Sequence, residues 1–262
     1  MSDLILHCGG KLVTREEIDA IAMPPQTETY YPISHGKMID HIRDRATSLL
    51  GLPILSEQYG MNRSGAQFFG AITLDTGEES RGLTFGMRNS LDKSLRKGGA
   101  AGERVFVCDN LAFNGSDAIY TRKHTRNGWD DFMANMDQMI MDSTVAYARL
   151  GQCWSLLKAV DVDKIEGYQI LGELAGEEVI KPQQFSAAVA DWRNPPAKWA
   201  EIVDNDVNFA RRNMYNLYQC VTEGLKRGKA GDILENHTVV HDAFCGTKGM
   251  VPLLPAPEPA LA

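Results

Sequence analysis

The spacing of apolar residues predicts two helices near the N-terminus. Thr14 followed by Glu17 is typical of a capping box, so we expect a short helix that begins there, runs to about Met23 and is stopped by Pro24 and Pro25. Ser34 precedes a second segment, residues 35–50, in which apolar positions recur every three or four residues. A glycine and a proline follow this segment and are expected to end the helix.

From residue 54 the pattern changes to the shorter period of β-strands. Five segments fit a strand: residues 54–61, 67–74, 82–88, 104–108 and 118–124. Asp75-Thr76-Gly77, between the second and the third, has the chemistry of a hairpin turn. No linker between these strands is long enough for the crossover helix that a parallel pair needs. We therefore expect an antiparallel sheet of about five strands.

The rest of the chain has a helical pattern. A long helix is predicted from Trp129 to about residue 160, and its apolar stripe fits packing across one face of the sheet. Three more helical segments are expected at about 164–175, 182–192 and 199–227. The predicted class is α+β: an antiparallel sheet crossed by a long helix, with a helical C-terminal part. The expected regions are an N-terminal arm (1–35), an α+β core (36–160), a helical C-terminal region (161–250) and a disordered tail (251–262).

Composition narrows the class of protein. The hydrophobic fraction of 44% and the charged fraction of 23% are ordinary for a globular chain. The N-terminus does not have the pattern of a signal peptide, and no apolar run approaches the roughly 20 residues of a membrane helix. These features predict a cytoplasmic protein with no membrane partner. The five cysteines are widely spaced and form no CxxC pair, which argues against a disulfide framework.

Charge is distributed unevenly along the chain. The net charge is -7, yet residues 81–126 hold nine basic and only four acidic residues. Within them, the polar, glycine-ended segment 88–99 joins two predicted strands and could follow a phosphate backbone. The candidate nucleic-acid-binding residues are Arg88, Lys93, Arg96, Lys97, Arg104, Arg122, Lys123 and Arg126. The alternative is an ordinary solvated surface loop.

Aromatic residues lie on the neighbouring predicted strands. They are Phe68, Phe69, Phe85, Phe106 and Tyr120. Any of them that faced outward could stack on the bases of a single strand. The alternative is that they belong to the hydrophobic core.

Two other groupings contain the residue types of reactive sites. His237, His241 and Cys245 are four residues apart, so on a helix they would share one face and could bind zinc. No fourth ligand is evident, and an ordinary surface helix is the simpler interpretation. Cys108 could be a nucleophile activated by His124, although a buried cysteine before a turn is the simpler interpretation. The sequence contains no phosphate-binding loop motif and no GxSxG motif. We therefore expect no cofactor, no metal and no catalytic residue.

Three segments carry a resemblance to a known family. They run from Gly82 to Ser94, from Gly102 to Phe113 and from Arg122 to Thr125. In this order they resemble an uncharacterised phage/plasmid-like family (domain of unknown function 932), over about residues 50–160. Members of that family tend to belong to mobile elements of bacteria, so the resemblance implies a bacterial host cell. The family's order of elements is similar to that of the single-strand annealing recombinases of phages, a likeness at the level of the fold.

Three hypotheses for function follow. The resemblance implies a DNA-binding protein of the annealing type, with single-stranded DNA in a groove lined by the basic residues and subunits joined into a homo-oligomer. A second hypothesis is an antidefence or antirestriction protein that binds a host protein, since an acidic chain suits a partner that normally binds DNA. The third is an enzyme of unknown chemistry that uses Cys108 or His124.

Overall fold

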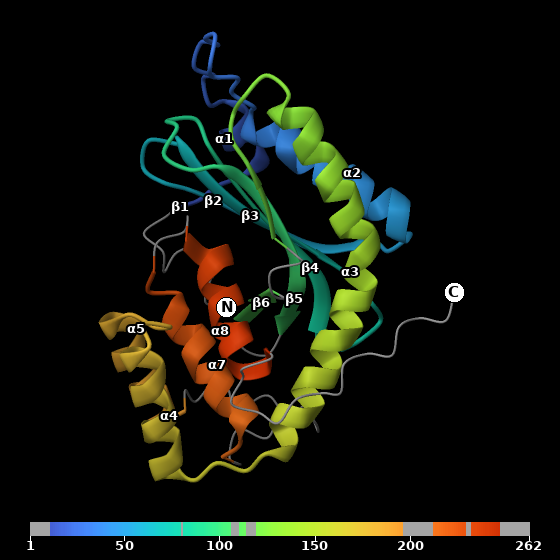
Figure 1. Ribbon diagram of the computed structural model, residues 1–262. Coiled ribbons are helices and arrows are strands. Elements are labelled where there is room, and N and C mark those ends of the chain that lie inside the picture. The colour runs from blue at the N-terminus through green and yellow to red at the C-terminus, as the bar shows by residue number, and fades with distance from the viewer. Residues whose placement is uncertain are drawn as a thin grey trace.

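The computed structural model describes residues 11–79, 81–105, 110–113, 119–195, 212–228 and 232–246. Figure 1 shows a twisted sheet, one long helix running along it and a group of further helices beside the lower part of the sheet. The described elements, in chain order, are β1 (Lys11–Leu12), α1 (Arg15–Asp19), α2 (His35–Leu50), β2 (Ile54–Met61), β3 (Gln67–Leu74), β4 (Arg81–Ser90), β5 (Lys97–Val105), β6 (Asn110–Phe113), β7 (Ile119–Arg122), α3 (Gly128–Ala159), α4 (Lys164–Gly176), α5 (Pro182–Arg193), α7 (Met214–Leu225) and α8 (Ile233–Cys245). The predicted α+β class is confirmed: an antiparallel sheet crossed by a long helix, with a helical C-terminal part.

From β2 onward the sheet is a meander of antiparallel hairpins. Its order is β1-β2-β3-β4-β5-β6, and β7 also pairs with β5. β7 lies along the first half of β5 and β6 along the second half, so both occupy the same edge of that strand. The predicted hairpin turn between β3 and β4 is confirmed, with Gly77 at a φ of 75°. Glycine suits this position because a side chain is rarely tolerated at positive φ.

The predicted starts of both N-terminal helices and the end of α2 are also confirmed, whereas α1 ends at Asp19, before the predicted end at about Met23. Thr14 and Glu17 form the expected capping box at the start of α1, in which each side chain accepts from the other residue's backbone N–H. Ser34 caps α2, and Gly51 ends it in the left-handed conformation. α3 matches the long helix predicted from Trp129.

The later helices agree with the pattern where the structure describes them. α4 and α5 match the predicted segments 164–175 and 182–192. Of the segment 199–227, only residues from 212 onward are described, and α7 lies within them. The predicted tail, 251–262, lies outside the described residues. Among the described helices, none is both long enough and apolar enough to cross a membrane.

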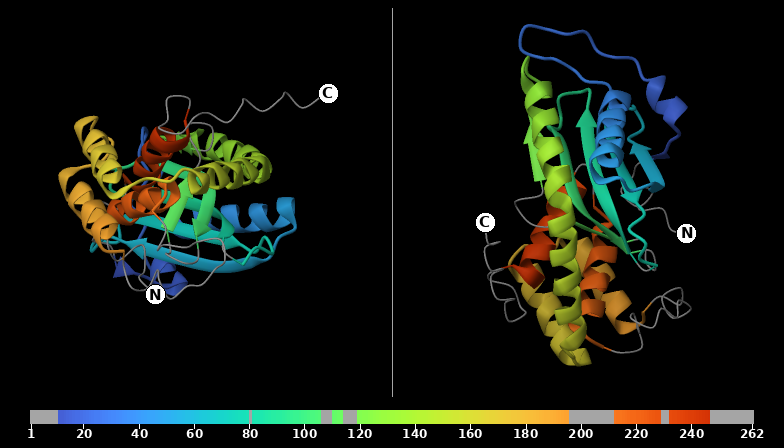
Figure 2. Two further views of the ribbon diagram at one scale, coloured as in Figure 1. Left: turned by 90° about the horizontal axis from the view of Figure 1, so that it is seen from below. Right: turned by 90° about the vertical axis from the view of Figure 1, so that its right-hand side faces the viewer.

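Two hydrophobic cores lie along α3. The first half of the helix packs with α2 on one face of the sheet, where Phe132 and Phe85 are both fully buried. Its last turns pack against α4, α5, α7 and α8, in a second core that contains Trp154 and Tyr218. The right-hand view of Figure 2 shows α3 running past both parts of the molecule. One helix therefore contributes apolar side chains to both cores.

The β4 and β5 strands are longer toward their shared turn than the sequence pattern predicts. β4 continues to Ser90 and β5 begins at Lys97, so the connection shrinks from the predicted segment 88–99 to residues 91–96. The first half of β5 is rich in glycine and alanine, which have low strand propensity, yet it pairs with β4 on one side and β7 on the other. Strand pairing on both sides overrides the local preference.

One disulfide corrects the expectation drawn from the cysteines. Cys153 of α3 and Cys245 of α8 are bonded, with Cα atoms 6.3 Å apart and 92 residues between them in sequence. Cysteine spacing could not reveal this bond, because it depends on how α8 packs against the far end of α3. Among the described residues Cys220 is a free, buried thiol.

Gly99→Ala tests the packing of α3 against β5. A Cβ at Gly99 would lie 2.3 Å from Sδ of Met136, which is itself fully buried and has little room to move. We expect the free energy of unfolding to fall by about 1–3 kcal/mol in urea denaturation. Gly172→Ala is the control, because a Cβ at Gly172 of α4 meets nothing within 4 Å. It should stabilise by roughly 0.5–1 kcal/mol. Equal effects of the two substitutions would contradict close packing at Gly99.

Candidate nucleic-acid interface

Three connections meet at one end of the sheet. They are the β2–β3 turn (62–66), the β4–β5 turn (91–96) and the link from β7 to α3 (123–127). They share this end because β2, β4 and β7 run toward it in an antiparallel sheet. α2 and α3 both begin here, at the upper end of Figure 1 and of the right-hand view of Figure 2. We call this the basic end, for the side chains described next.

The basic end gathers part of the predicted set of cations. Lys93, Arg96, Lys123 and Arg126 are exposed on it, and Arg122 is half-buried. Within the part of the chain that the structure describes, Arg96, Lys123 and Arg126 have no ion-pair partner. These three side chains are therefore available to bind an anion.

Two further cations at this end were not predicted. Arg63, in the β2–β3 turn, and Lys37, in the first turn of α2, are both exposed. Neither lies in the basic segment 81–126, so a count of charges along the sequence could not find them. Placing the β2–β3 and β4–β5 hairpins side by side would have brought Arg63 next to the β4–β5 turn. This alignment is the sequence signal that could have added Arg63 to the site.

Acidic side chains share the basic end and limit its charge. They are Glu28, Asp92, Asp130 and Asp131, all exposed. Asp92 accepts hydrogen bonds from the backbone N–H and the hydroxyl of Ser94, which hold it within its own turn. The excess of positive charge is therefore modest, and any binding of an anion here should be sensitive to salt.

Aromatic rings position two of the lysines. Lys93 Nζ lies 4.7 Å from the centre of the Tyr30 ring, and Lys37 Nζ lies 4.9 Å from the centre of the Trp129 ring. Cation–π contacts of this kind hold an ammonium group without neutralising its charge. Both lysines can therefore still attract a phosphate.

Buried polar contacts hold the turns in place. Asn89 Nδ2 donates to the carbonyl of Ile33 at 2.8 Å and faces His35 Nδ1 at 3.1 Å, while His35 Nε2 lies 3.1 Å from the carbonyl of Gly65. Because Asn89 can only donate here, His35 must accept at Nδ1 and carry its proton on Nε2. Burial lowers the pKa of His35, in keeping with this neutral form. The network joins the β2–β3 turn to β4 and the segment before α2.

Lys97 does not lie on the surface, which corrects its predicted role. Its side chain is fully buried, and its Nζ donates to the carbonyl of Lys123 at 2.6 Å. Burial lowers the pKa of Lys97 to about 8. The predicted loop that would have exposed it is instead the start of β5. Lys97 positions the link that carries Lys123 and Arg126, and it does not contact a ligand in this conformation.

Arg88 and Arg104 also lie away from the basic end surface. Arg88 is buried on the sheet face opposite α2 and α3, where its guanidinium pairs with Glu235 of α8. Arg104 lies near the other end of β5, half-buried, and donates to Ser56 Oγ at 3.0 Å. Both residues were predicted to bind nucleic acid together with Lys93 and Arg96. The lengths and pairing of β4 and β5 separate them.

The aromatic residues proposed to stack bases belong mostly to the core. Phe68, Phe69 and Phe85 are no more than 2% exposed. Phe106 and the side chain of Tyr120 lie outside the described part of the structure. In this conformation the three buried rings cannot reach a base.

The grouping on α8 does not form a metal site among the described residues, and the grouping of Cys108 with His124 lies partly outside them. α8 is not the expected surface helix, since His237 and His241 are both buried and Cys245 is in the disulfide. In the described part of the chain no three metal-ligating side chains cluster. Cys108 lies outside the described residues. Burial lowers the pKa of His124 to about 4, so it stays neutral at physiological pH.

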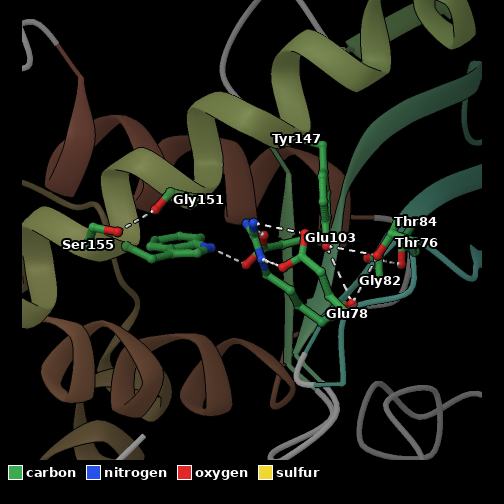
Figure 3. A network of polar contacts seen from close by, with 10 residues as sticks. Thr76, Glu78, Gly82, Thr84, Glu103, Tyr147, Gly151 and Ser155 are labelled. Carbon is green, nitrogen blue, oxygen red and sulfur yellow. Dashed lines mark hydrogen bonds and ion pairs between the residues drawn. The ribbon is translucent and has the colours of Figure 1, made fainter. Parts of the chain in front are cut away.

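A buried carboxyl group, not anticipated from the sequence, connects the sheet to α3 (Figure 3). Glu103 of β5 is fully buried and accepts from the indole N–H of Trp154 and, at 3.1 Å, from Arg81 Nη1. Arg81 also binds the carboxylate of Glu78 at 2.6 Å and stacks on the ring of Tyr147 at 4.4 Å. Burial raises the pKa of Glu103 to about 7, against the opposing effects of Arg81 and Trp154. Both carboxyl oxygens of Glu103 accept hydrogen bonds from this chain. The network therefore joins the sheet to α3 and leaves no carboxyl oxygen free to react.

Comparison of the chain with protein-family models, curated proteins and solved structures finds no match. The resemblance to the phage/plasmid-like family therefore stays a prediction. The function must be argued from the basic end itself.

Asn89→Ala tests the network that holds the turns. The substitution leaves the carbonyl of Ile33 and Nδ1 of His35 without their donor inside the protein. We expect the free energy of unfolding to fall by about 1–3 kcal/mol in chemical denaturation. Asn62→Ala is the comparison, because Asn62 is only partly buried and accepts within its own turn. A loss at Asn89 no larger than the loss at Asn62 would contradict this role.

Glu103→Gln tests the buried carboxyl through the pH dependence of stability. The pKa of Glu103 is raised on folding from 4.5 to about 7, so its contribution to stability is present below pH 4.5 and is lost as the pH rises toward 7. We expect the variant to gain stability relative to the wild type between pH 5 and pH 8, measured by urea denaturation. Glu78→Gln, which removes the more exposed carboxylate bound to the same arginine, should not show this gain. Parallel pH profiles for the wild type and Glu103→Gln would refute the raised pKa.

Proposed function

We propose that this chain binds nucleic acid through the phosphate backbone at its basic end, with single-stranded DNA as its ligand. The observation that carries the proposal is that separate turns bring exposed cations to one end of the sheet. Arg63, Arg96, Lys123 and Arg126 come from three connections and have no ion-pair partner among the described residues. In an acidic chain, cations left unpaired together at one end favour an anionic ligand.

The helix ends at this surface add to the attraction. The N-termini of α2 and α3 carry the positive ends of their helix dipoles. Ser34 already caps α2, but Asn127 makes no capping hydrogen bond with its side chain at the start of α3. The N–H of Gly128 instead donates to the carbonyl of Thr125, so the start of α3 adds the field of its helix dipole beside Lys123 and Arg126.

The contacts proposed here are to phosphates and not to bases. The buried rings of Phe68, Phe69 and Phe85 offer no stacking surface, while lysine and arginine recognise the charge of the backbone. A strand held by its phosphates keeps its bases free to pair with a second strand. This agrees with the annealing role that the family resemblance implies, and it needs no nucleotide hydrolysis.

Buried side chains fix the turns of the basic end before any ligand binds. The β2–β3 and β4–β5 turns and the link after β7 are each fixed by contacts to buried side chains, namely His35, Ser90 and Lys97. Exposed cations on fixed turns lose less conformational freedom on binding than cations on a mobile loop.

Reversal of two charges tests the proposal. Lys123→Glu/Arg126→Glu should weaken binding to a labelled single-stranded oligonucleotide by at least about tenfold at low salt, measured by fluorescence anisotropy. The slope of log affinity against log salt should also fall by about 1.4, because each phosphate contact to a single strand contributes about 0.7.

Lys164→Glu/Arg193→Glu is the matched control. It changes the net charge equally, at exposed positions on α4 and α5. Equal loss in the two variants would show that only net charge matters and would remove the basic end from the mechanism. If the wild type binds no oligonucleotide at low salt, the proposal fails, and a host protein becomes the partner to seek.

A further inference from the structure

The outward face of α3 has a regular pattern of side chains that the described part of the fold leaves exposed. Gln138, Met141, Val145, Ala148, Gln152 and Ser155 are all exposed, and we call these six residues the α3 seam. They alternate at spacings of three and four, which is the a/d spacing of a coiled coil. Met141 and Val145 are 50% and 55% exposed, although both are apolar. The right-hand view of Figure 2 shows α3 at the front of the molecule along its length.

The inward face of α3 accounts for its other apolar residues. Met136, Leu150 and Leu157 are buried in the two cores, and Ser143, at the same position of the seven-residue repeat, is also buried. The seam lies on the opposite side of the same helix. A single long helix thus has a buried face used within the chain and a second heptad face with no use inside the described fold.

We infer that two copies of this chain associate through the α3 seam, as an antiparallel helix pair with two-fold symmetry. The charges beside the seam favour a second copy as the partner. In a two-fold pair that places Val145 against Ala148 of the second copy, Asp142 lies against Arg149 of the second copy, and the same pair repeats by symmetry. In a coiled coil, charges at these flanking positions select the partner and its orientation. Asp142 and Arg149 are both exposed.

The same register also pairs the other residues of the α3 seam. Met141 then lies against Gln152 of the second copy, and Gln138 lies against Ser155. On the other flank Asp137 is already bound to Arg45 of α2, so the pair of Asp142 and Arg149 carries the charge complementarity. A parallel arrangement in register would place Met141 beside Met141 and would set Asp142 beside Asp137 of the second copy instead of Arg149. The charge pattern is therefore complementary to itself only when the helices are antiparallel.

The arrangement sets the geometry of the assembly. The two-fold axis crosses α3 near residue 146, so the two helix N-termini point in opposite directions. At 1.5 Å per residue the two basic ends lie roughly 55 Å apart along the helix axis. One helix from each copy makes a small interface, so we expect a dissociation constant on the order of micromolar. The dimer does not depend on nucleic-acid binding.

Sedimentation equilibrium of the full chain from about 1 to 200 μM tests the dimer. We expect the wild type to be in equilibrium between monomer and dimer. Val145→Glu should raise the dissociation constant at least about tenfold, because it places a carboxylate beside the centre of the seam in each copy. Val239→Glu on α8, at a position 47% exposed, should leave the constant unchanged. Melting curves followed by circular dichroism establish that each variant is folded.

Charge reversal tests the register. Arg149→Asp alone should weaken the dimer about fivefold or more, because Asp142 then faces an aspartate. Asp142→Arg/Arg149→Asp should restore the affinity of the wild type, since both pairs are re-formed in reverse. A wild type that is monomeric at every concentration, or a dimer that survives Val145→Glu, would overturn the inference. A double variant as weak as the single one would overturn the antiparallel register.

Discussion

The burial of one face of α3 along its whole length is the interaction on which the rest of the structure depends. Its first half completes the core over the sheet, and its last turns complete the core of the C-terminal helices. Near the junction, Trp154 donates to the buried carboxyl of Glu103, and the neighbouring Cys153 is bonded to α8. The sheet and the C-terminal helices are thereby joined through one helix. A change in the packing of α3 would be felt in both cores.

The same helix also places the candidate site. α3 begins at the end of the sheet where the turns meet, and Lys97 reaches from β5 to the carbonyl of Lys123 just before that beginning. Burying an ammonium group is costly, which is why the pKa of Lys97 is lowered to about 8. A buried lysine at this position is consistent with a role in fixing the link that carries Lys123 and Arg126. The basic end is thus a fixed surface at one end of the molecule, and it lies away from the α3 seam.

The sequence predicted the elements well where local signals are strong. The capping box at Thr14, the hairpin turn before β4 and the apolar period of α3 are all local features, and all are confirmed. The class of fold followed from their order. The first half of β5 escaped prediction because its residues have little strand propensity and depend on pairing with β4 and β7.

The site was predicted only in part, for the same physical reason. A cluster of charges in sequence indicated where cations are, but it could not separate the exposed Lys93 and Arg96 from the buried Arg88 and Lys97. That separation depends on strand length and side-chain direction. Arg63 joins the site only through hairpin alignment. The disulfide of Cys245 and the burial of Glu103 depend on contacts between elements far apart in the chain.

Photo-crosslinking of a single-stranded oligonucleotide to the wild-type chain, with the attached residues mapped by mass spectrometry, tests whether the basic end is the site of binding. It locates the ligand without altering any charge. We expect cross-links in the β2–β3 turn, the β4–β5 turn and residues 122–129, and none on α4 or α5. Cross-links concentrated on the C-terminal helices, or no cross-link at low salt, would contradict the basic end as the site of binding.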